Sequence, residues 1–319
     1  MDVSMSNILC QMFPPKPKWT TEDIPDLTGK VCLVTGGNTG IGKETCKRLL
    51  MKNAIVYMAA RSQHKAEEAI KGLKEETGKE ARFLQLDLAD LDSVKRSAEE
   101  FKQHEEKLNV LFLNAGVMVP PIEQLTSQGY DMQFGTNVLG HFLFLKLLYP
   151  LLSASSSPSA PARLIWTASS VNYYFRPPIK FDTLEDGQAR RALGVTQLYC
   201  QSKFATVLLV KHLAKTCKDD GVIVIVVDPG NIKSDLQRYG PDSAIKGALR
   251  SAMHSMILHP VELGALTQLY CGTAPEAADY NGRYLRPWAR LGEPHKGTND
   301  VQAQEEMWDY CDGEVKAWV

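Results

Sequence analysis

The sequence has no excess of charge of either sign. It contains 36 Lys and Arg residues against 37 Asp and Glu residues, for a formal net charge of −1, with no block of like charges. Proteins that bind nucleic acid carry a basic patch or stripe that neutralises phosphates. The balanced charge therefore argues against nucleic acid as a partner. With 44% hydrophobic residues, the composition is that of an ordinary soluble globular protein.

The seven cysteines lack a pairing pattern, because they are scattered, odd in number and never spaced as C-x-x-C. A disulfide framework uses an even set, and a zinc site uses closely spaced ligands. We therefore expect no disulfide framework and no metal site. Free thiols are typical of a reducing compartment, so we expect a cytoplasmic protein.

A long hydrophobic run is also absent, since no 18 consecutive residues are apolar. The longest candidates, residues 108–122 and 138–152, are interrupted by Asn or Lys and are too short to span a bilayer. The first residues, MDVSMSNILCQMF, lack the basic segment and apolar run of a secretory signal. The sequence predicts no transmembrane segment, and leaves peripheral contact with a membrane open.

From residue 29 onward, strand-like and helix-like patterns alternate. Short apolar runs such as VCLVTG and AIVYMAA are separated by helical patterns of about 10–15 residues, which predicts βαβ units and a parallel sheet. The strand runs are apolar almost throughout, as strands covered on both faces should be. We expect an α/β fold: a single doubly wound Rossmann-type domain over residues 29–319, preceded by a proline-rich tail over residues 1–28.

A glycine-rich turn, GGNTGIG at residues 36–42, joins the first strand to the first helix. Glycines let the backbone approach a pyrophosphate closely, and a helix N-terminus supplies N–H groups and a positive dipole. The spacing is G-x-x-x-G-x-G, so a purely structural turn is the alternative. Its place between strand and helix favours a dinucleotide site that includes Gly36, Asn38, Gly40, Ile41 and Gly42.

The end of the second predicted strand distinguishes NAD from NADP. An acidic residue there accepts the ribose 2′-OH of NAD, whereas an arginine accommodates a 2′-phosphate. This sequence has Arg61, with Lys65 one helical turn further on and Asn38 short enough to reach the same phosphate. A solvated surface arginine is the alternative, and we predict NADP(H).

Tyr199 and Lys203 are spaced at i and i+4, which places them on one face of a predicted helix. A free Tyr has a pKa of about 10, and a neighbouring ammonium favours its ionised form. Such a tyrosine suits general acid catalysis of carbonyl reduction and general base catalysis of alcohol oxidation. Alone, Y-x-x-x-K is frequent by chance.

Further motifs occur in order along the chain: TGGNTGIG, Asp87-Leu88, NAG at residues 114–116, Asn137, Ser169-Ser170, YCQSK and DPG at residues 228–230. Together they resemble the short-chain dehydrogenase/reductase superfamily. The wider match, with NTGIGKET, YMAARS, LDLADL, LNAGVM, NVLGHFLF and EMWDYCD, is similar to its retinol-dehydrogenase and WW-domain-oxidoreductase-like branch. The resemblance covers about residues 25–315 and implies a mostly parallel seven-stranded sheet with helices on both faces.

The resemblance also implies catalytic roles. Tyr199 is the proton donor and acceptor, and Lys203 lowers the pKa of Tyr199 and holds the nicotinamide ribose. Ser170, the second serine of its pair, polarises the substrate carbonyl, and Asn137 positions a water for proton relay. The alternatives are a strand-end hydroxyl bonded to backbone for Ser170 and a polar residue inside a helix for Asn137.

The implied cofactor contacts extend the glycine turn, with Asp87 and Leu88 facing the adenine and the NAG residues facing the adenosine ribose. The residues after DPG line the nicotinamide. The full predicted cofactor set is Gly36, Asn38, Gly40, Ile41, Gly42, Arg61, Lys65, Asp87, Leu88, Asn114, Ala115, Gly116, Tyr199, Lys203, Pro229, Gly230, Ile232 and Ser234.

The substrate side is expected at residues 172–195 and 235–259, which follow the carboxyl ends of strands. The second stretch carries apolar residues at helical spacing: Leu236, Tyr239, Ile245, Leu249, Met253 and Met256. Apolar linings suit a lipophilic substrate, although simple packing is the alternative. We expect an NADP-dependent oxidoreductase that acts on the CH–OH group of a lipophilic alcohol or on its carbonyl counterpart, with a role in specialised metabolism and a homodimer left open. The competing hypothesis is a catalytically silent NADP-binding regulatory protein.

Overall fold

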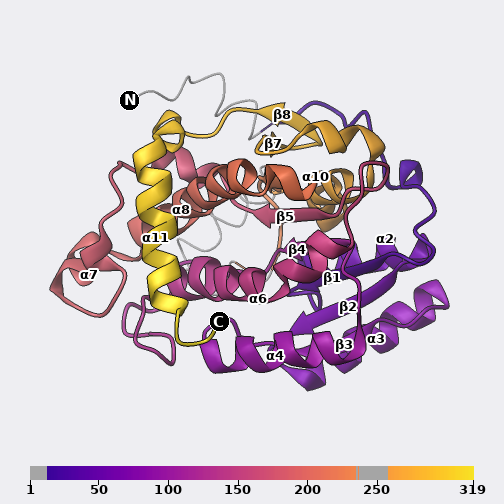
Figure 1. Ribbon diagram of the computed structural model, residues 1–319, viewed down its shortest axis with the longest axis horizontal. Coiled ribbons are helices and arrows are strands. Elements are labelled where there is room, and N and C mark those ends of the chain that lie inside the picture. The colour runs from indigo at the N-terminus through magenta and orange to yellow at the C-terminus, as the bar shows by residue number, and fades with distance from the viewer. Residues whose placement is uncertain (1–12, 235, 237–257) are drawn as a thin grey trace, which may run out of the picture.

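The computed structural model describes residues 13–234, 236 and 258–319. Within these residues eight strands form one sheet in the order β3-β2-β1-β4-β5-β6-β7-β8 (Figure 1). The strands are β1 Val31–Thr35, β2 Ile55–Ala60, β3 Arg82–Gln85, β4 Val110–Leu113, β5 Arg163–Thr167, β6 Ile223–Val227, β7 Tyr284–Arg286 and β8 Arg290–Gly292. The order reverses at β1, which pairs with β2 on one side and β4 on the other.

Strands β1 to β7 are parallel, and β8 pairs antiparallel with β7. The predicted α/β class and mostly parallel sheet are confirmed. The predicted number of seven strands is wrong by one for the part of the chain described. The additional strand, β8, is only three residues long and follows β7 after three residues, so it is too short to show a hydrophobic period.

Helices cover both faces of the sheet (Figure 1). One core cluster packs β-strand side chains against α4, α6, α8 and α11, and a second packs the opposite face against α2, α3 and α10. The α-helices are α2 Gly40–Met51, α3 Gln63–Thr77, α4 Leu91–His104, α5 Met132–Phe134, α6 Gly140–Ala154, α7 Gln188–Leu193, α8 Val195–Thr216, α10 Val261–Thr273 and α11 Val301–Val315. Short 3₁₀ turns occur at η1 Thr21–Asp23, η3 Ser170–Tyr174, η4 Phe181–Thr183, η5 Lys218–Asp220, η7 Pro275–Asp279 and η8 Lys296–Asn299.

A π-helical turn, η2 Gly135–Leu139, joins α5 to α6. The three pieces form one helical stretch, Met132–Ala154, that is long and apolar enough to cross a membrane. Its most apolar window is 61% buried inside the protein. The stretch is therefore a core helix of this fold, packed against α4 and the sheet.

The last helix, α11, lies across α6 and α8 (Figure 1). Its Trp308 contacts Phe142 edge-to-face at 4.9 Å between ring centroids and stacks on His212 at 4.8 Å. Asp312 pairs with Lys146 of α6. These contacts place α11 over the outer surface of α8, which carries Tyr199 and Lys203, and of α6, which continues the turn that holds Asn137.

Part of the predicted N-terminal tail is docked on the domain. Ile24 and Leu27 are buried in the second core cluster, and the Leu27 N–H donates to the Lys52 carbonyl at 2.7 Å. Trp19 meets Tyr270 of α10 edge-to-face at 5.4 Å. The boundary at residue 28 stays a prediction, and residues 1–12 lie outside the described part.

The segment expected on the substrate side, residues 172–195, contains η4 and α7. Arg190 of α7 is buried, with 1% of its side chain exposed, and pairs with the Asp131 carboxylate at 3.2 Å. Arg190 also donates to the Ile122 carbonyl at 2.6 Å. Asp131 in turn caps α5 by accepting the backbone N–H groups of Gln133 and Phe134, both at 3.0 Å. The pair therefore fastens α7 to the start of the long helical stretch.

Candidate active site

A cleft of about 770 Å³ opens at the carboxyl ends of the parallel strands. All the residues predicted to contact a cofactor line it, from Gly36 to Ser234. Most of them lie after the end of a strand, and the carboxyl ends of parallel strands meet at one edge. Tyr199 and Lys203 reach the cleft from α8. Their individual contacts with a cofactor remain predictions.

The glycine turn is packed too closely on itself and on the NAG turn to accept side chains at Gly36 and Gly42. Gly36 and Gly40 have positive φ angles of +67° and +52°, which favour glycine. A Cβ on Gly42 would lie 2.2 Å from the carbonyl oxygen of Gly36, which no side chain tolerates. The cradle in front of the α2 N-terminus therefore fits a dinucleotide pyrophosphate.

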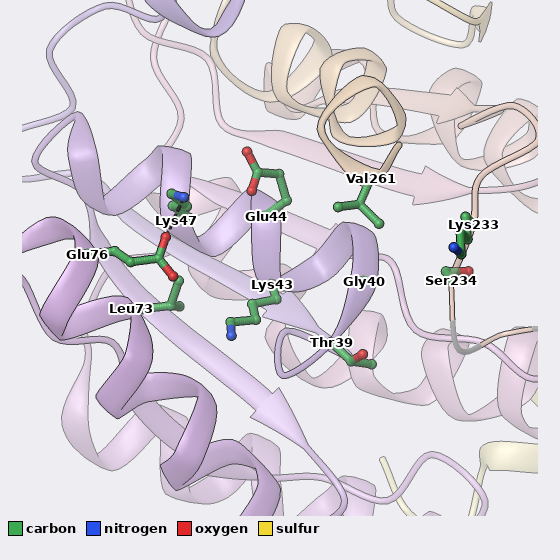
Figure 2. A pocket seen from close by; sticks show the side chains of 10 residues that line it. All are labelled: Thr39, Gly40, Lys43, Glu44, Lys47, Leu73, Glu76, Lys233, Ser234 and Val261. Atoms are coloured by element: carbon green, nitrogen blue, oxygen red, sulfur yellow. Dashed lines mark ion pairs between the residues drawn. The ribbon is translucent and has the colours of Figure 1, made fainter. Parts of the chain in front are cut away.

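Beside this cradle lies a smaller cavity of about 290 Å³ that the sequence analysis did not anticipate. Figure 2 shows its lining, in which Lys47 of α2 pairs with Glu76 of α3. Lys43 belongs to both cavities. Lys43 is consequently a cation at the edge of the predicted cofactor site that motif reasoning missed.

The NAG turn is held against the end of β1 by Thr35. The Thr35 hydroxyl accepts the N–H groups of Asn114 and Ala115 at 2.9 and 3.0 Å. The Asn114 amide donates to the Thr35 carbonyl at 2.8 Å. Since Thr35 is fully buried, these bonds fix the position of the predicted ribose-binding turn relative to the glycine cradle.

His141 of α6 connects Thr35 to Asn137. Its Nε2 lies 2.9 Å from the Thr35 hydroxyl oxygen and its Nδ1 lies 3.2 Å from the Asn137 carbonyl oxygen. Burial lowers the pKa of His141 to about 3, so the ring is neutral. A carbonyl oxygen can only accept, so we assign the ring proton to Nδ1, which donates to the Asn137 carbonyl. The Thr35 hydroxyl, which also lies 3.4 Å from the Phe112 carbonyl oxygen, can then donate to Nε2.

Asn137 lies in the π-helical turn, 1% exposed, behind the cleft. Its side-chain oxygen accepts the Val117 N–H at 2.8 Å, and its amide donates to the Val117 carbonyl at 3.0 Å and the Ser202 hydroxyl at 3.1 Å. Both ends of the amide are thus used inside the protein. A water positioned by Asn137, which stays a prediction, would have to bind its backbone carbonyl.

Tyr199 and Lys203 are both buried on α8, with 5% and 4% of their surface exposed. The Lys203 Nζ donates to the Thr167 carbonyl at 2.9 Å. Burial lowers the pKa of Lys203 to about 8, while Asp228 raises it. Burial raises the pKa of Tyr199 above its usual value, and a hydrogen bond with the Ser169 side chain opposes that shift.

The two adjacent serines have different partners. The Ser169 side chain is bonded to Tyr199, whereas the Ser170 backbone N–H donates to the Asp228 carboxylate. Ser169 is still extended, with φ −170°, and Ser170 is the first residue of η3. The Thr167 side chain bonds Gln268 of α10, so the alternation of side chains along β5 does not indicate which serine faces Tyr199 of α8. Both serines line the cleft. The Ser169 side chain is the one bonded to Tyr199, and it also accepts the Val171 N–H at 3.4 Å. The catalytic role of Ser170 stays a prediction.

Arg61 and Lys65 line the cleft just after the end of β2, where the sequence predicts the adenosine ribose, and both are exposed. The Arg61 carbonyl accepts the Gln85 side-chain amide at 2.8 Å, and Ser62 caps α3. Glu68 also lines the cleft and was not anticipated. The Arg61 side chain therefore stands where the second strand ends, as the sequence predicts.

The lining of the cleft includes the apolar residues Met118, Met132, Val171, Leu236 and Leu258. Of the residues predicted on the substrate side, Leu236 is therefore found in the cleft. The others lie outside the described residues: Tyr239, Ile245, Leu249, Met253 and Met256.

The aromatic cluster at residues 173–175 is divided between core and surface. Phe175 packs in the core, with its ring centroid 5.0 Å from that of Phe204. Tyr174 is half exposed. For Phe175, the alternative of simple packing describes the structure.

Comparisons with known proteins agree with this geometry. The family model described as short chain dehydrogenase matches residues 30–173. A short-chain dehydrogenase/reductase of Armillaria gallica is 50% identical over 310 residues, covering 97% of this chain and 98% of its own. Retinol dehydrogenase 11 of Mus musculus is 38% identical over 288 residues, covering 90% and 86%. The solved RhlG/NADP active-site complex of Pseudomonas aeruginosa superimposes with a TM-score of 0.65 at 25% identity, covering 82% and 95%.

Proposed function

Because this chain belongs to the short-chain dehydrogenase/reductase family and resembles its retinol-dehydrogenase-like branch, we propose that it is an NADP(H)-dependent oxidoreductase interconverting a lipophilic alcohol and its aldehyde or ketone. One observation carries the proposal. Tyr199 and Lys203 are buried one helical turn apart at the base of a cleft that the whole predicted cofactor set lines. A silent binding protein would have no need to keep this pair buried and in register.

Different residues of the chain transfer the proton and stabilise the reacting oxygen. Tyr199 donates a proton to the carbonyl oxygen in reduction and accepts the alcohol proton in oxidation. The Ser169 hydroxyl is placed to donate a hydrogen bond to the same oxygen as charge develops on it. When bound, the nicotinamide supplies or accepts the hydride.

Lys203 supports Tyr199 in two ways. Its pKa of about 8 keeps the ammonium charged at neutral pH, and that charge favours the phenolate form of Tyr199. An ammonium has three N–H donors, and one of them is used by the Thr167 carbonyl. The others are available to ribose hydroxyls and to a water of the proton relay.

The preference for NADP(H) is supported by the Arg61 and Lys65 cations, which line the cleft just after the end of β2. A guanidinium meets a 2′-phosphate through paired charge-assisted hydrogen bonds. The RhlG structure, which has the same fold, is a complex with NADP.

A lipophilic substrate is supported by the Met and Leu residues in the lining of the cleft. Retinol dehydrogenase 11 is named for a lipophilic alcohol. A cytoplasmic location is part of the proposal and is supported by the free cysteines among the described residues, since free thiols are typical of a reducing compartment. A role in specialised metabolism is part of the proposal and rests on the sequence analysis alone.

The test is a panel of lipophilic aldehydes, ketones and alcohols assayed with NADPH or NADH in parallel. We expect turnover of at least one class and a kcat/KM at least about tenfold higher with NADPH. The control is Tyr199→Phe, which should bind NADPH with unchanged affinity and lose turnover, because only the transferable proton is removed. NADPH binding without turnover of any substrate would favour the silent regulatory protein. Comparable turnover by Tyr199→Phe would contradict the proposed acid–base role.

A further inference from the structure

A buried carboxylate lies beside the proposed active site and has no part in the mechanism above. Asp228, the first residue after β6, is 1% exposed. Its carboxylate accepts the Gly230 N–H at 3.0 Å, the Ser170 N–H and, at 3.4 Å, the Tyr284 hydroxyl. All three donors are neutral, so none of them cancels its charge.

The donors connect Asp228 to both loops at the base of the cleft. Ser170 follows Ser169, and Gly230 lines the predicted nicotinamide end. Asp228 therefore joins the serine loop after β5 to the loop after β6. On the β7 side, the Tyr284 hydroxyl also accepts the Asn172 amide at 3.3 Å, and the Tyr173 ring packs edge-to-face on Tyr284.

The Lys203 Nζ donates to the Thr167 carbonyl, and Thr167 pairs in the sheet with Val227, the residue before Asp228. Lys203 and Asp228 therefore meet at the same pair of strand ends, and Tyr199 lies one turn of α8 from Lys203. Burial lowers the pKa of Lys203 and raises that of Tyr199, and the negative charge of Asp228 raises both. Burial raises the pKa of Asp228 to about 6, although its hydrogen bonds and the Lys203 charge act to lower it. At pH 7 and above the carboxylate is therefore ionised.

We propose that Asp228 is a positioning residue whose negative charge sets the pH range over which Tyr199 and Lys203 exchange protons. The inference rests on the proposed function and adds to it a fixed counter-charge. The carboxylate holds the Lys203 ammonium in its charged form and opposes the Tyr199 phenolate. Removal of a negative charge makes each remaining proton leave at lower pH.

The test compares Asp228→Asn with the wild type across pH. Asparagine keeps the shape and one acceptor oxygen but removes the charge. We expect both limbs of the pH profile of kcat/KM for alcohol oxidation to move to lower pH by about one unit, a tenfold change in proton affinity. The matched control is Tyr284→Phe, which removes one hydrogen bond to Asp228 and leaves its charge. Above pH 7, the pH profile of kcat/KM for this variant should therefore coincide with that of the wild type.

A second measurement needs neither substrate nor cofactor. The pKa of Lys203 is read by NMR titration of carbon-13-labelled lysine side chains, with the signal assigned from Lys203→Arg. We expect a lower Lys203 pKa in Asp228→Asn, by about one unit. This readout separates the inference from the proposed function, because it stands even if no substrate turns over.

The Lys203 pKa measured in Asp228→Asn decides whether the inference holds. An unshifted Lys203 pKa, or a shift to higher pH, overturns it. If Asp228→Asn does not fold, Asp228→Ser provides a smaller neutral side chain whose hydroxyl can accept the Gly230 N–H. The same downward shift is then expected, and its absence overturns the inference equally.

Discussion

At the scale of single residues, the two serines after β5 allow a specific prediction about kcat. Ser169 bonds to Tyr199 through its side chain, whereas Ser170 reaches Asp228 through its backbone N–H. Ser169→Ala should lower kcat by about 10²–10³, as loss of a donor to a developing oxyanion does. Ser170→Ala keeps its backbone bond and should cost less than about tenfold on that scale. Steady-state kinetics of the two variants checks this, and the reverse ranking would return the role to Ser170.

Arg61 is the residue on which the predicted preference for NADPH over NADH depends. Loss of a charge-assisted contact with the 2′-phosphate costs about 1.5–3 kcal/mol, which is about a ten- to hundredfold preference. Arg61→Asp should shrink or reverse the NADPH preference, mainly through KM, because the contact is the same in ground and transition states. Lys71→Asp, a charge reversal on an exposed part of α3, is the control and should leave the ratio unchanged. An unchanged ratio in Arg61→Asp would show that Arg61 is a surface residue.

Motif spacing predicted which residues meet in the cleft, because strand ends converge in any parallel sheet. It chose Ser170 from the family position, but it could not show that the Ser169 side chain is bonded to Tyr199, since the two residues are chemically identical and only the backbone turn at η3 separates their directions. It also left Asp228 without a role. The partner Tyr284 is 56 positions away, on a strand of three residues. Because tyrosine is neutral, no pairing of opposite charges in the sequence connects it with Asp228.

At the scale of elements, the Arg190–Asp131 pair fastens α7 to α5. Both side chains are nearly inaccessible, and burial raises the pKa of Asp131 against the lowering effect of its hydrogen bonds. Arg190→Leu leaves a buried carboxylate without its cation and should reduce the free energy of unfolding by about 3–5 kcal/mol. Urea denaturation measures this.

The neighbouring Arg191 provides the matched control, because its pair with Asp186 is exposed. Arg191→Leu should cost no more than about 1 kcal/mol. The deficit of Arg190→Leu should also shrink at acid pH, where Asp131 takes up a proton. Equal losses in the two variants would mean that the buried pair contributes nothing beyond a surface pair.

The elements themselves were only partly predictable. The long helix was expected from its apolar run, but the π-helical turn Gly135–Leu139 depends on which carbonyl each N–H reaches, and residue types do not record that choice. Helix α7 was not expected within residues 172–195, because the six residues QARRAL are too few to show a helical period.

At the scale of the whole molecule, His141 links stability to pH. Its pKa in the folded protein is about 3, against about 6.5 in an unfolded chain. The unfolded state therefore binds the proton more tightly, and stability present above pH 6.5 is lost as the pH falls toward 3. The loss from this one group approaches about 1.4 kcal/mol per pH unit inside that window.

The measurement is the free energy of unfolding at a series of pH values for the wild type and His141→Gln. The variant should show a shallower slope between pH 6.5 and 3, whatever its stability at pH 7. His64→Gln is the control, because the side chain of His64 is 82% exposed and its removal should leave the slope unchanged. Parallel slopes for the wild type and His141→Gln would mean that the buried ring takes up its proton as readily as a free one.

The position of α11 over α6 and α8 has a consequence for biosynthesis. Every strand of the described sheet, and every residue assigned to the chemistry, leaves the ribosome before α11 does. Until then the apolar surface that Trp308 covers on Phe142 has no partner. A stop codon after Asp300 would therefore delete no reacting group and still expose that surface, which promotes aggregation. A nonsense mutation at this point would therefore act through insolubility: the cell would synthesise every residue assigned to the chemistry and still lack soluble enzyme.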